Sequence, residues 1–318
     1  MITGIDPKVD YAFKRVFGSE ENTNVLRHLL NAVLAGSVVP PLLDVTILNP
    51  FSLKDAVDDR LSVLDIKARD AAGSEYLLEM QLFAKASFPE RLLYYAAKHY
   101  SQQLKEGEGY ERLRPVIVIC FVNAVLFPLS PGYHGRYELV DEKAGVRYSD
   151  HLAIHVLELP KFPKTVDELC EDEDRWTYFL RHGSELDPTN LPESLSIPEI
   201  RQATGTLTML SLSEVEREQY ESRLKRSRDE EASLRYVKET ALVEGLEKGL
   251  EQGLEQGLEQ GRTEEARSIL LRNGVRRYGP VPAEVLSALQ ATTDCERLEA
   301  LVDRMFDGHG WDTLLDCR

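Results

Sequence analysis

Two acidic residues in one short stretch have the clearest chemical potential in this sequence. Asp65 and Glu79 lie in residues 61–69 and 75–83, where polar and apolar residues alternate. An alternation of period two predicts β-strands, and the Asp-Ala-Ala-Gly-Ser segment at 70–74 predicts a turn between them. If that turn is symmetric about Ala72, Asp65 lies opposite Glu79, with Cβ atoms about 4.5–5.5 Å apart on one face.

Two carboxylates placed opposite each other repel, so we expect a cation between them. A divalent ion such as Mg²⁺ is the economical choice, because it binds one or two protein carboxylates together with water and phosphate oxygens. The alternative is that both side chains are solvated on an exposed strand face. Asp10, in a predicted helix at residues 9–17, is a third acidic candidate. A carboxylate near a helix N-terminus is also favourable without any ligand.

Basic residues recur in the segment that follows the predicted hairpin. A helix is expected over residues 87–106, beginning at Ser-Phe-Pro-Glu and ending at Gly107. Arg91, Lys98 and Lys105 are spaced seven residues apart, which keeps them on roughly one helix face near Tyr94. Such a stripe suits contacts to a phosphate backbone. The alternative is the solvated face of an ordinary amphipathic helix.

The elements around these residues predict an α/β fold. Helical spacing of apolar residues at 9–17 and 24–34 is followed by strand patterns at 43–48, 61–69 and 75–83, then by the basic helix. Residues 115–121 form a continuous apolar run, which is typical of a strand buried on both faces. A last strand is expected at 152–159. His151 and His155 are four residues apart there, a spacing that does not bring side chains together on a strand.

The composition is that of a globular protein, and its charge is unevenly distributed. The 318 residues carry a net charge of −16, with 42% hydrophobic and 29% charged residues. Residues 1–165 have 19 Lys and Arg against 21 Asp and Glu, so the acidity belongs to the second half. No apolar run approaches the ~18 residues of a membrane span, so we expect no membrane partner. The four cysteines are far apart, which fits a reducing, cytoplasmic location.

The second half is expected to be mostly α-helical. We divide the chain into a domain at 1–165, a helical region at 166–245, a repeat helix at 246–261 and a small helical domain at 262–318, with helix breaks at Asn273-Gly274, Gly279-Pro280 and Gly308. The repeat reads Leu-Glu-Lys-Gly and then three times Leu-Glu-Gln-Gly. Each leucine advances about 40° around a helix, and each glycine costs about 1 kcal/mol relative to Ala. The segment is either a flexible helical spacer or a surface for homo-oligomerisation.

Several stretches together resemble a known family. They are DYAFKRVFG at 10–18, LDIKARDAAGSEYLLEMQ at 64–81, RLLYYAAKHYSQQLKEGEGYERLRPVIVI at 91–119, LELPKF at 157–162 and the glycine-containing repeat. Over about residues 5–262 the chain resembles the recombination-promoting nucleases and transposases of bacteria, within the PD-(D/E)xK nuclease superfamily. The resemblance implies a restriction-endonuclease-like core, in which helices flank a mixed central sheet.

The resemblance also implies roles for individual residues. Asp65 and Glu79 would bind Mg²⁺ or Mn²⁺, with Asp10 as an accessory ligand. Gln81 stands where the family motif usually has Lys, which positions and activates the attacking water. Gln81 can hydrogen-bond that water but carries no charge, and Lys67 is a candidate substitute. The basic residues expected to contact DNA phosphates are Lys14, Arg91, Lys98 and Lys105.

The leading hypothesis is a metal-dependent DNA endonuclease acting in recombination or transposition, with DNA as its partner. A second hypothesis is a catalytically degenerate nuclease fold that binds DNA without cutting it. A third is a protein-interaction module in which the repeat and the acidic helices dominate. No P-loop, dinucleotide fingerprint or nucleophilic Ser or Cys constellation is visible in the sequence.

Overall fold

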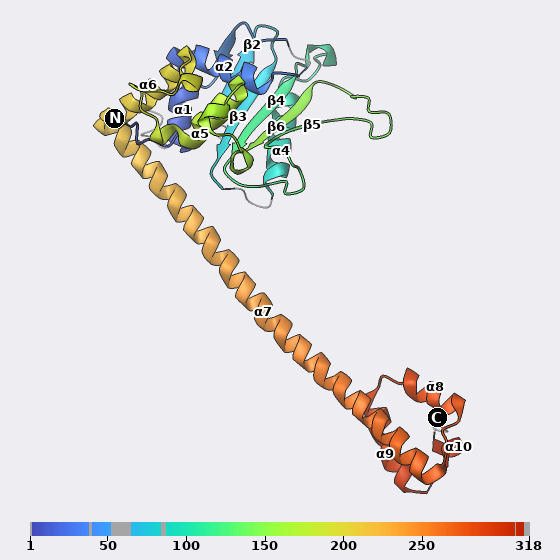
Figure 1. The fold of residues 1–318 in the computed structure, drawn as a ribbon. Coiled ribbons are helices and arrows are strands. Elements are labelled where there is room, and N and C mark those ends of the chain that lie inside the picture. The colour runs from blue at the N-terminus through green and yellow to red at the C-terminus, as the bar shows by residue number, and fades with distance from the viewer. Residues whose placement is uncertain (1, 38–39, 52–64, 84–86, 309, 315–318) are drawn as a thin grey trace. The chain divides into compact units, whose positions relative to one another are not determined.

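The structure is a computed structural model that describes residues 2–37, 40–51, 65–83, 87–308 and 310–314 (Figure 1). Its contacts divide the chain into two compact units, Met1–Ala232 and Ser233–Arg318. The first unit contains the central sheet and all the candidate site residues named above. None of the helices in the described ranges is both long and apolar enough to cross a membrane.

A six-stranded mixed sheet forms the centre of the first unit. Its strands are β1 (Val45–Ile47), β2 (Ile66–Asp70), β3 (Glu75–Gln81), β4 (Val116–Val122), β5 (His134–Glu138) and β6 (Leu152–Glu158), in the spatial order β1-β2-β3-β4-β6-β5. The pairs β1/β2, β2/β3 and β5/β6 are antiparallel, whereas β3/β4 and β4/β6 are parallel. All seven residues of β4 are buried, as its apolar run predicts. The sequence pattern did not predict β5.

Helices cover both faces of this sheet (Figure 1). In chain order, the α-helices among the described residues of this unit are α1 (Asp10–Phe17), α2 (Thr23–Val33), α4 (Phe88–Ser101), α5 (Asp172–His182), α6 (Pro198–Leu212) and the start of α7 (Glu214–Tyr278). Helix α4 connects the parallel strands β3 and β4 and packs on one face through Phe88, Leu92 and Ala96. The other face packs against α1 and α2, with α5 and α6 completing the same core.

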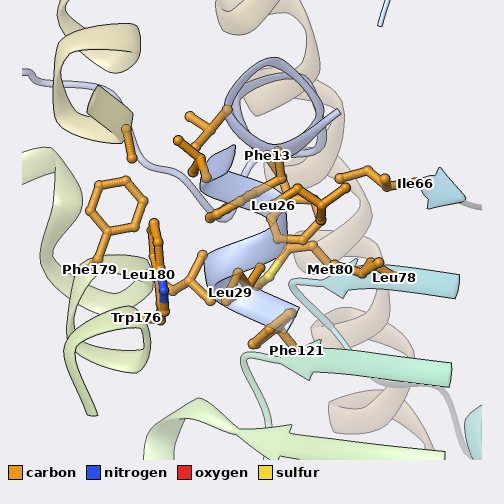
Figure 2. Packing of buried hydrophobic residues seen from close by; sticks show 14 of the residues in the cluster. Phe13, Leu26, Leu29, Ile66, Leu78, Met80, Phe121, Trp176, Phe179 and Leu180 are labelled. Atoms are coloured by element: carbon orange, nitrogen blue, oxygen red, sulfur yellow. The ribbon is translucent and has the colours of Figure 1, made fainter. Parts of the chain in front are cut away.

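The larger core contains many aromatic and branched side chains (Figure 2). Phe13 from α1 lies between the sheet and Phe17, with ring centroids 6.0 Å from Phe121 and 5.0 Å from Phe17. Trp176 of α5 is fully buried and contacts Phe17 edge-on at 5.4 Å. This packing fixes α1, which carries Asp10 and Lys14, against the strands of the hairpin.

The expected domain boundary at residue 165 does not match this packing. Trp176, Ile200 and Leu207 are fully buried in the same core as the sheet. The first turns of α7 also contact α1, since Glu216 accepts a 2.9 Å hydrogen bond from Arg15. Helices that the composition shift assigned to a separate region therefore complete the core, and the first compact unit continues to Ala232.

The second unit is helical, as expected. It contains the rest of α7, then α8 (Ala283–Ala291), α9 (Cys295–Phe306) and α10 (Trp311–Leu314) around a small apolar core. The expected break at Asn273-Gly274 is wrong, because α7 continues through it to Tyr278. A Cβ at Gly274 would meet the Trp311 ring at 2.1 Å. Glycine is needed there because the Trp311 ring packs directly against the helix backbone. The break at Gly279, with φ +81°, is confirmed.

Candidate metal and nucleic-acid site

The β2–β3 hairpin has the predicted register. Ile66 pairs with Leu78 and Lys67 with Leu77, so Asp65, directly before β2, lies one step beyond the last pair and opposite Glu79. The Met80 N–H donates a 2.7 Å hydrogen bond to Asp65 Oδ2, which holds the carboxylate against β3. Residues 61–64 of the first predicted strand lie outside the described residues.

Both carboxylates are buried, which contradicts the alternative of a solvated strand face. Glu79 is only 3% exposed, and its Oε1 atom has no hydrogen-bond partner among the described residues. The Asp65 side chain is 11% exposed. Burial, followed by the charge of Asp65, raises the pKa of Glu79 to about 8. Burial, followed by the charge of Asp10, raises the pKa of Asp65 to about 7. In the absence of a further cation, both shifts favour the protonated carboxyls.

A lysine from α1 provides one cation at this site. Lys14 Nζ lies 2.6 Å from Asp10 Oδ1 and 3.2 Å from Asp65 Oδ1. Burial opposes the ionisation of Asp10, but Lys14, a hydrogen bond with Asp65 and the charge of Arg223 outweigh it and lower the Asp10 pKa. Burial likewise opposes the charge on Lys14, and its two acidic neighbours raise its pKa nevertheless. Lys14, predicted as a DNA contact, therefore lies between two predicted metal ligands.

The three residues of the predicted basic stripe lie in different environments. Arg91 is half-buried and places its guanidinium 4.8 Å from the centre of the Phe88 ring. Its charge acts to lower the pKa of Glu79, against the larger effect of burial. Lys98 is exposed, 5.8 Å from the centre of the Tyr94 ring. Helix α4 ends at Ser101, so the expected helix to residue 106 is wrong and Lys105 lies in the exposed chain beyond it.

The two candidates for the missing motif lysine lie in different places. Gln81 is the last residue of β3, half-buried, with Nε2 a long 3.5 Å from the Met80 carbonyl. Lys67 is on the sheet face of Glu79, because residues of one face alternate along a strand. Its charge lowers the pKa of His99 on α4, a shift whose main cause is burial. When Lys67 is compared with Lys14 of α1, it is Lys14 that forms an observed ion pair with Asp65.

The oxygen donors at this site are of the kind that Mg²⁺ and Mn²⁺ prefer. The unpartnered Glu79 Oε1 and the raised pKa values of both hairpin carboxyls are consistent with a place for positive charge. Within the described ranges, no group of three or more His, Cys, Asp or Glu side chains is already arranged to hold a metal. Metal binding at Asp65, Glu79 and Asp10 therefore requires loss of protons and movement of the Lys14 ammonium.

The contacts of His155 were not predicted by the sequence pattern. His155 is 2% exposed, and its Nδ1 lies 2.9 Å from His134 Nε2. His134 in turn is 2.9 Å from Glu173. His151 contacts the Tyr100 hydroxyl instead, so the two histidines four residues apart have different partners, as expected on a strand. His155 thus contacts His134 on β5, which contacts Glu173 on α5, and no local spacing indicates this chain of contacts.

A mixed sheet with an acidic hairpin, flanked by a helix that carries an acidic residue, defines a nuclease-like α/β fold of the PD-(D/E)xK type. The chain belongs to the PD-(D/E)XK nuclease family transposases, whose family model matches residues 7–237. The match ends close to the end of the first compact unit at Ala232. No curated protein and no solved structure matches the chain significantly.

Proposed function

We propose that this protein is a divalent-metal-dependent DNA endonuclease that acts in recombination or transposition. The single observation that carries the proposal is the buried pair of Asp65 and Glu79, with one unpartnered oxygen on Glu79. A carboxylate pair buried in this way is unfavourable by itself, because burial and mutual repulsion both oppose ionisation. Sites that retain such a pair commonly use it to bind a cation or transfer a proton.

Asp65, Glu79 and Asp10 would hold Mg²⁺ or Mn²⁺. When bound, such an ion stabilises charge on a phosphate and generates a hydroxide nucleophile near neutral pH. The backbone bond from Met80 orients Asp65 before any ion arrives. Lys14, released from Asp65, would place its ammonium next to the reacting phosphate. Gln81 would orient the attacking water, with Lys67 as a second source of positive charge on the same strand face.

Cations on α4 and in the chain directly after it would hold the DNA backbone. Lys98 and Lys105 are exposed, whereas Arg91 is half-buried near Glu79. Arg91 would therefore contact a phosphate close to the cut, and the two lysines would contact flanking ones. Contacts of this kind fix the position of a strand without reading its sequence, so we expect little sequence preference.

Plasmid nicking tests this proposal. Wild-type protein in Mg²⁺ or Mn²⁺ should convert supercoiled plasmid to the nicked form, and EDTA should abolish the reaction. Asp65→Asn should lower the rate at least 100-fold, since removal of one group that stabilises transition-state charge costs about 10²–10³ in other enzymes. Asp150→Asn, at an exposed aspartate, is the matched control. Equal nicking by wild type and Asp65→Asn would refute the proposal.

A second candidate function is a catalytically degenerate nuclease fold that binds DNA or another protein. Gln81 at the lysine position and the ion pairs of Lys14 favour it, because Lys14 offsets the charge of Asp10 and Asp65 without a metal. DNA binding that persists in EDTA, with no nicking at any Mg²⁺ or Mn²⁺ concentration, would support this alternative.

The oligomeric state and location also remain predictions. We propose that the repeat segment mediates homo-oligomerisation: its leucines at 246, 250, 254 and 258 are 61–77% exposed. A Cβ added at Gly249, Gly253 or Gly257 would meet nothing within 4 Å, so this part of α7 could admit a second helix at close range. A cytoplasmic location is likewise proposed from cysteine usage.

A further inference from the structure

A polar cavity of about 440 Å³ lies at the opposite end of β3 from Glu79. It is formed where the β2–β3 turn, the C-terminal end of α4 and the segment before β4 meet. Its lining includes Arg69, Glu75, His99, Gln103, Arg112 and Arg114. Three arginines against one glutamate make the lining net positive, and none of these residues belongs to the carboxylate site described above.

A buried carboxylate positions one side of the cavity. Glu75 is 8% exposed and accepts a 2.7 Å hydrogen bond from Arg69, which fixes the direction of that guanidinium. His99 approaches the same carboxylate at 3.9 Å. The charge of Glu75 is thus matched by Arg69, and Arg112 is paired with Glu108 beside the cavity, which leaves Arg114 as the arginine in excess.

The other side of the cavity presents a guanidinium that is held by neutral groups. Arg114 Nη1 donates to the carbonyl oxygens of Glu111 and Leu113 at 3.1 and 3.0 Å. The Arg114 backbone N–H donates to the Gln103 side chain at 2.8 Å, which ties the segment to the end of α4. Across the described part of the chain, Arg114 has no carboxylate within ion-pair distance, whereas Arg112 pairs with Glu108. The guanidinium of Arg114 is therefore positioned and charged, but not neutralised.

The surroundings add positive charge. Burial lowers the pKa of His99, and the charges of Lys67 and Lys98 lower it further, against the opposite effect of Glu75. Both lysines therefore lie close enough for their charges to affect His99 in the cavity wall. At Gly73, with φ +92°, a Cβ would approach the Arg114 side chain at 3.2 Å, so glycine allows the turn to lie against this arginine.

The cavity and the carboxylates lie on one face of the sheet. Glu75 and Glu79 are four residues apart on β3, which corresponds to about 13 Å at 3.3 Å per residue. On the covering helix, Arg91 acts on Glu79 and His99 approaches Glu75, and eight helical residues span about 12 Å. The strand and the helix give the same separation between the cavity and Glu79.

We propose that this cavity is a second, metal-independent site that binds a phosphate group through Arg114, Arg112 and Arg69. A planar guanidinium donates two parallel hydrogen bonds to phosphate oxygens, and Arg114, which is held by carbonyl oxygens only, supplies the unneutralised charge. The separation from Glu79 suits another phosphate of the strand that is cut, a short way from the reacting one, an assignment that rests on the proposed nuclease function. A free nucleotide carries the same chemistry, and the test distinguishes the two sources.

The test is equilibrium binding by the full chain in EDTA, where cutting is prevented. The tracer is a fluorescent single-stranded oligonucleotide, read by anisotropy over a series of salt concentrations. Arg112→Gln/Arg114→Gln is compared with the control Arg217→Gln/Arg297→Gln. Arg217 is 62% exposed and pairs with a glutamate four residues away, as does Arg112, which is 64% exposed. Circular dichroism melting checks that all variants fold.

The cavity variant should bind at least tenfold more weakly, and its slope of log affinity against log salt should fall by about two, one for each lost phosphate contact. The control should stay within twofold of wild type. Competition by inorganic phosphate or dAMP, lost in the cavity variant, would assign a free phosphate ligand. A loss confined to the oligonucleotide would assign the DNA strand, and a preference for a 5′-phosphate over a 5′-hydroxyl would assign its end.

The cavity proposal is overturned if wild type and the cavity variant bind the oligonucleotide, inorganic phosphate and dAMP equally, or if the control loses as much affinity. Its failure is distinguishable from failure of the proposed nuclease function. Loss of binding in the cavity variant, with no nicking by wild type, would support the phosphate site and refute the proposed nuclease activity. Nicking that is abolished by Asp65→Asn, with unchanged binding by the cavity variant, would support the nuclease activity and refute the phosphate site.

Discussion

Replacing Glu79 by Gln should stabilise the metal-free protein, and the gain should grow with pH. The folded protein holds the Glu79 pKa at about 8 against an ordinary 4.5, first through burial and then through Asp65. A carboxyl whose pKa is raised by folding contributes fully to stability below its unfolded pKa. That contribution is lost as the pH rises through the folded value, because the unfolded chain releases its proton first.

The structure gives the size of this effect. A pKa of about 8 against 4.5 corresponds to roughly 4–5 kcal/mol, at about 1.4 kcal/mol for each tenfold change. Gln resembles the protonated carboxyl and does not titrate. Glu79→Gln and wild type should therefore be similar at pH 5, and the variant should be several kcal/mol more stable at pH 9. The Asp65 pKa, raised to about 7, responds to the same substitution, so the two contributions do not add independently.

Urea unfolding followed by circular dichroism, in EDTA at pH 5, 7 and 9, measures this difference. Glu106→Gln, at an exposed glutamate, is the control and should show no pH-dependent gain. Added Mg²⁺ should restore stability to wild type at pH 9, because the metal binds carboxylates in their deprotonated form and offsets the cost of their charge. Mg²⁺ should have little effect on Glu79→Gln. A variant less stable than wild type at pH 9 in EDTA would refute the argument that Glu79 is a buried, unneutralised carboxyl.

Three further predictions concern the rest of the chain. A fragment of residues 1–165 should fail to fold, whereas residues 1–232 should unfold cooperatively by circular dichroism, because Trp176 and Leu207 complete the main core; a folded shorter fragment would contradict this. Trp176→Ala should lower the free energy of unfolding by about 3–5 kcal/mol in urea titration, whereas Tyr148→Ala, at an 86% exposed ring, should have little effect. Leu250→Asp with Leu254→Asp should reduce the mass measured by sedimentation equilibrium if the repeat mediates oligomerisation, and an unchanged mass would remove that role.

Local patterns predict the central hairpin well. Alternation of period two on both sides of a short turn sets the register, because strand pairing across five turn residues leaves few alternatives. The relation of Asp65 to Glu79 therefore follows from neighbouring residues alone. The apolar run of β4 is equally local, since a strand between parallel neighbours is buried on both faces. The family assignment, with its nuclease fold, is also available at this level.

Features that depend on distant partners were not predicted. The boundary at residue 165 follows a real shift toward acidic composition, but the buried sides of α5 and α6 pack on α1 and α2. Strand β5 has a weak apolar pattern because only its pairing with β6 places it in the sheet. Gly274 indicates a helix break by itself, and only the neighbouring Trp311 ring explains a glycine inside α7.

The sequence by itself determined which residues can bind metal or phosphate and that two of them face each other on a hairpin. The tertiary structure decided their chemical state. Burial under α4, Lys14 from α1 and Arg91 from α4 set the protonation of Asp65 and Glu79. It also gathered arginines from β2 and the segment before β4 into one cavity. The physical reason is that desolvation and ion pairing depend on which segments pack together, whereas the alternation of a strand depends only on adjacent residues.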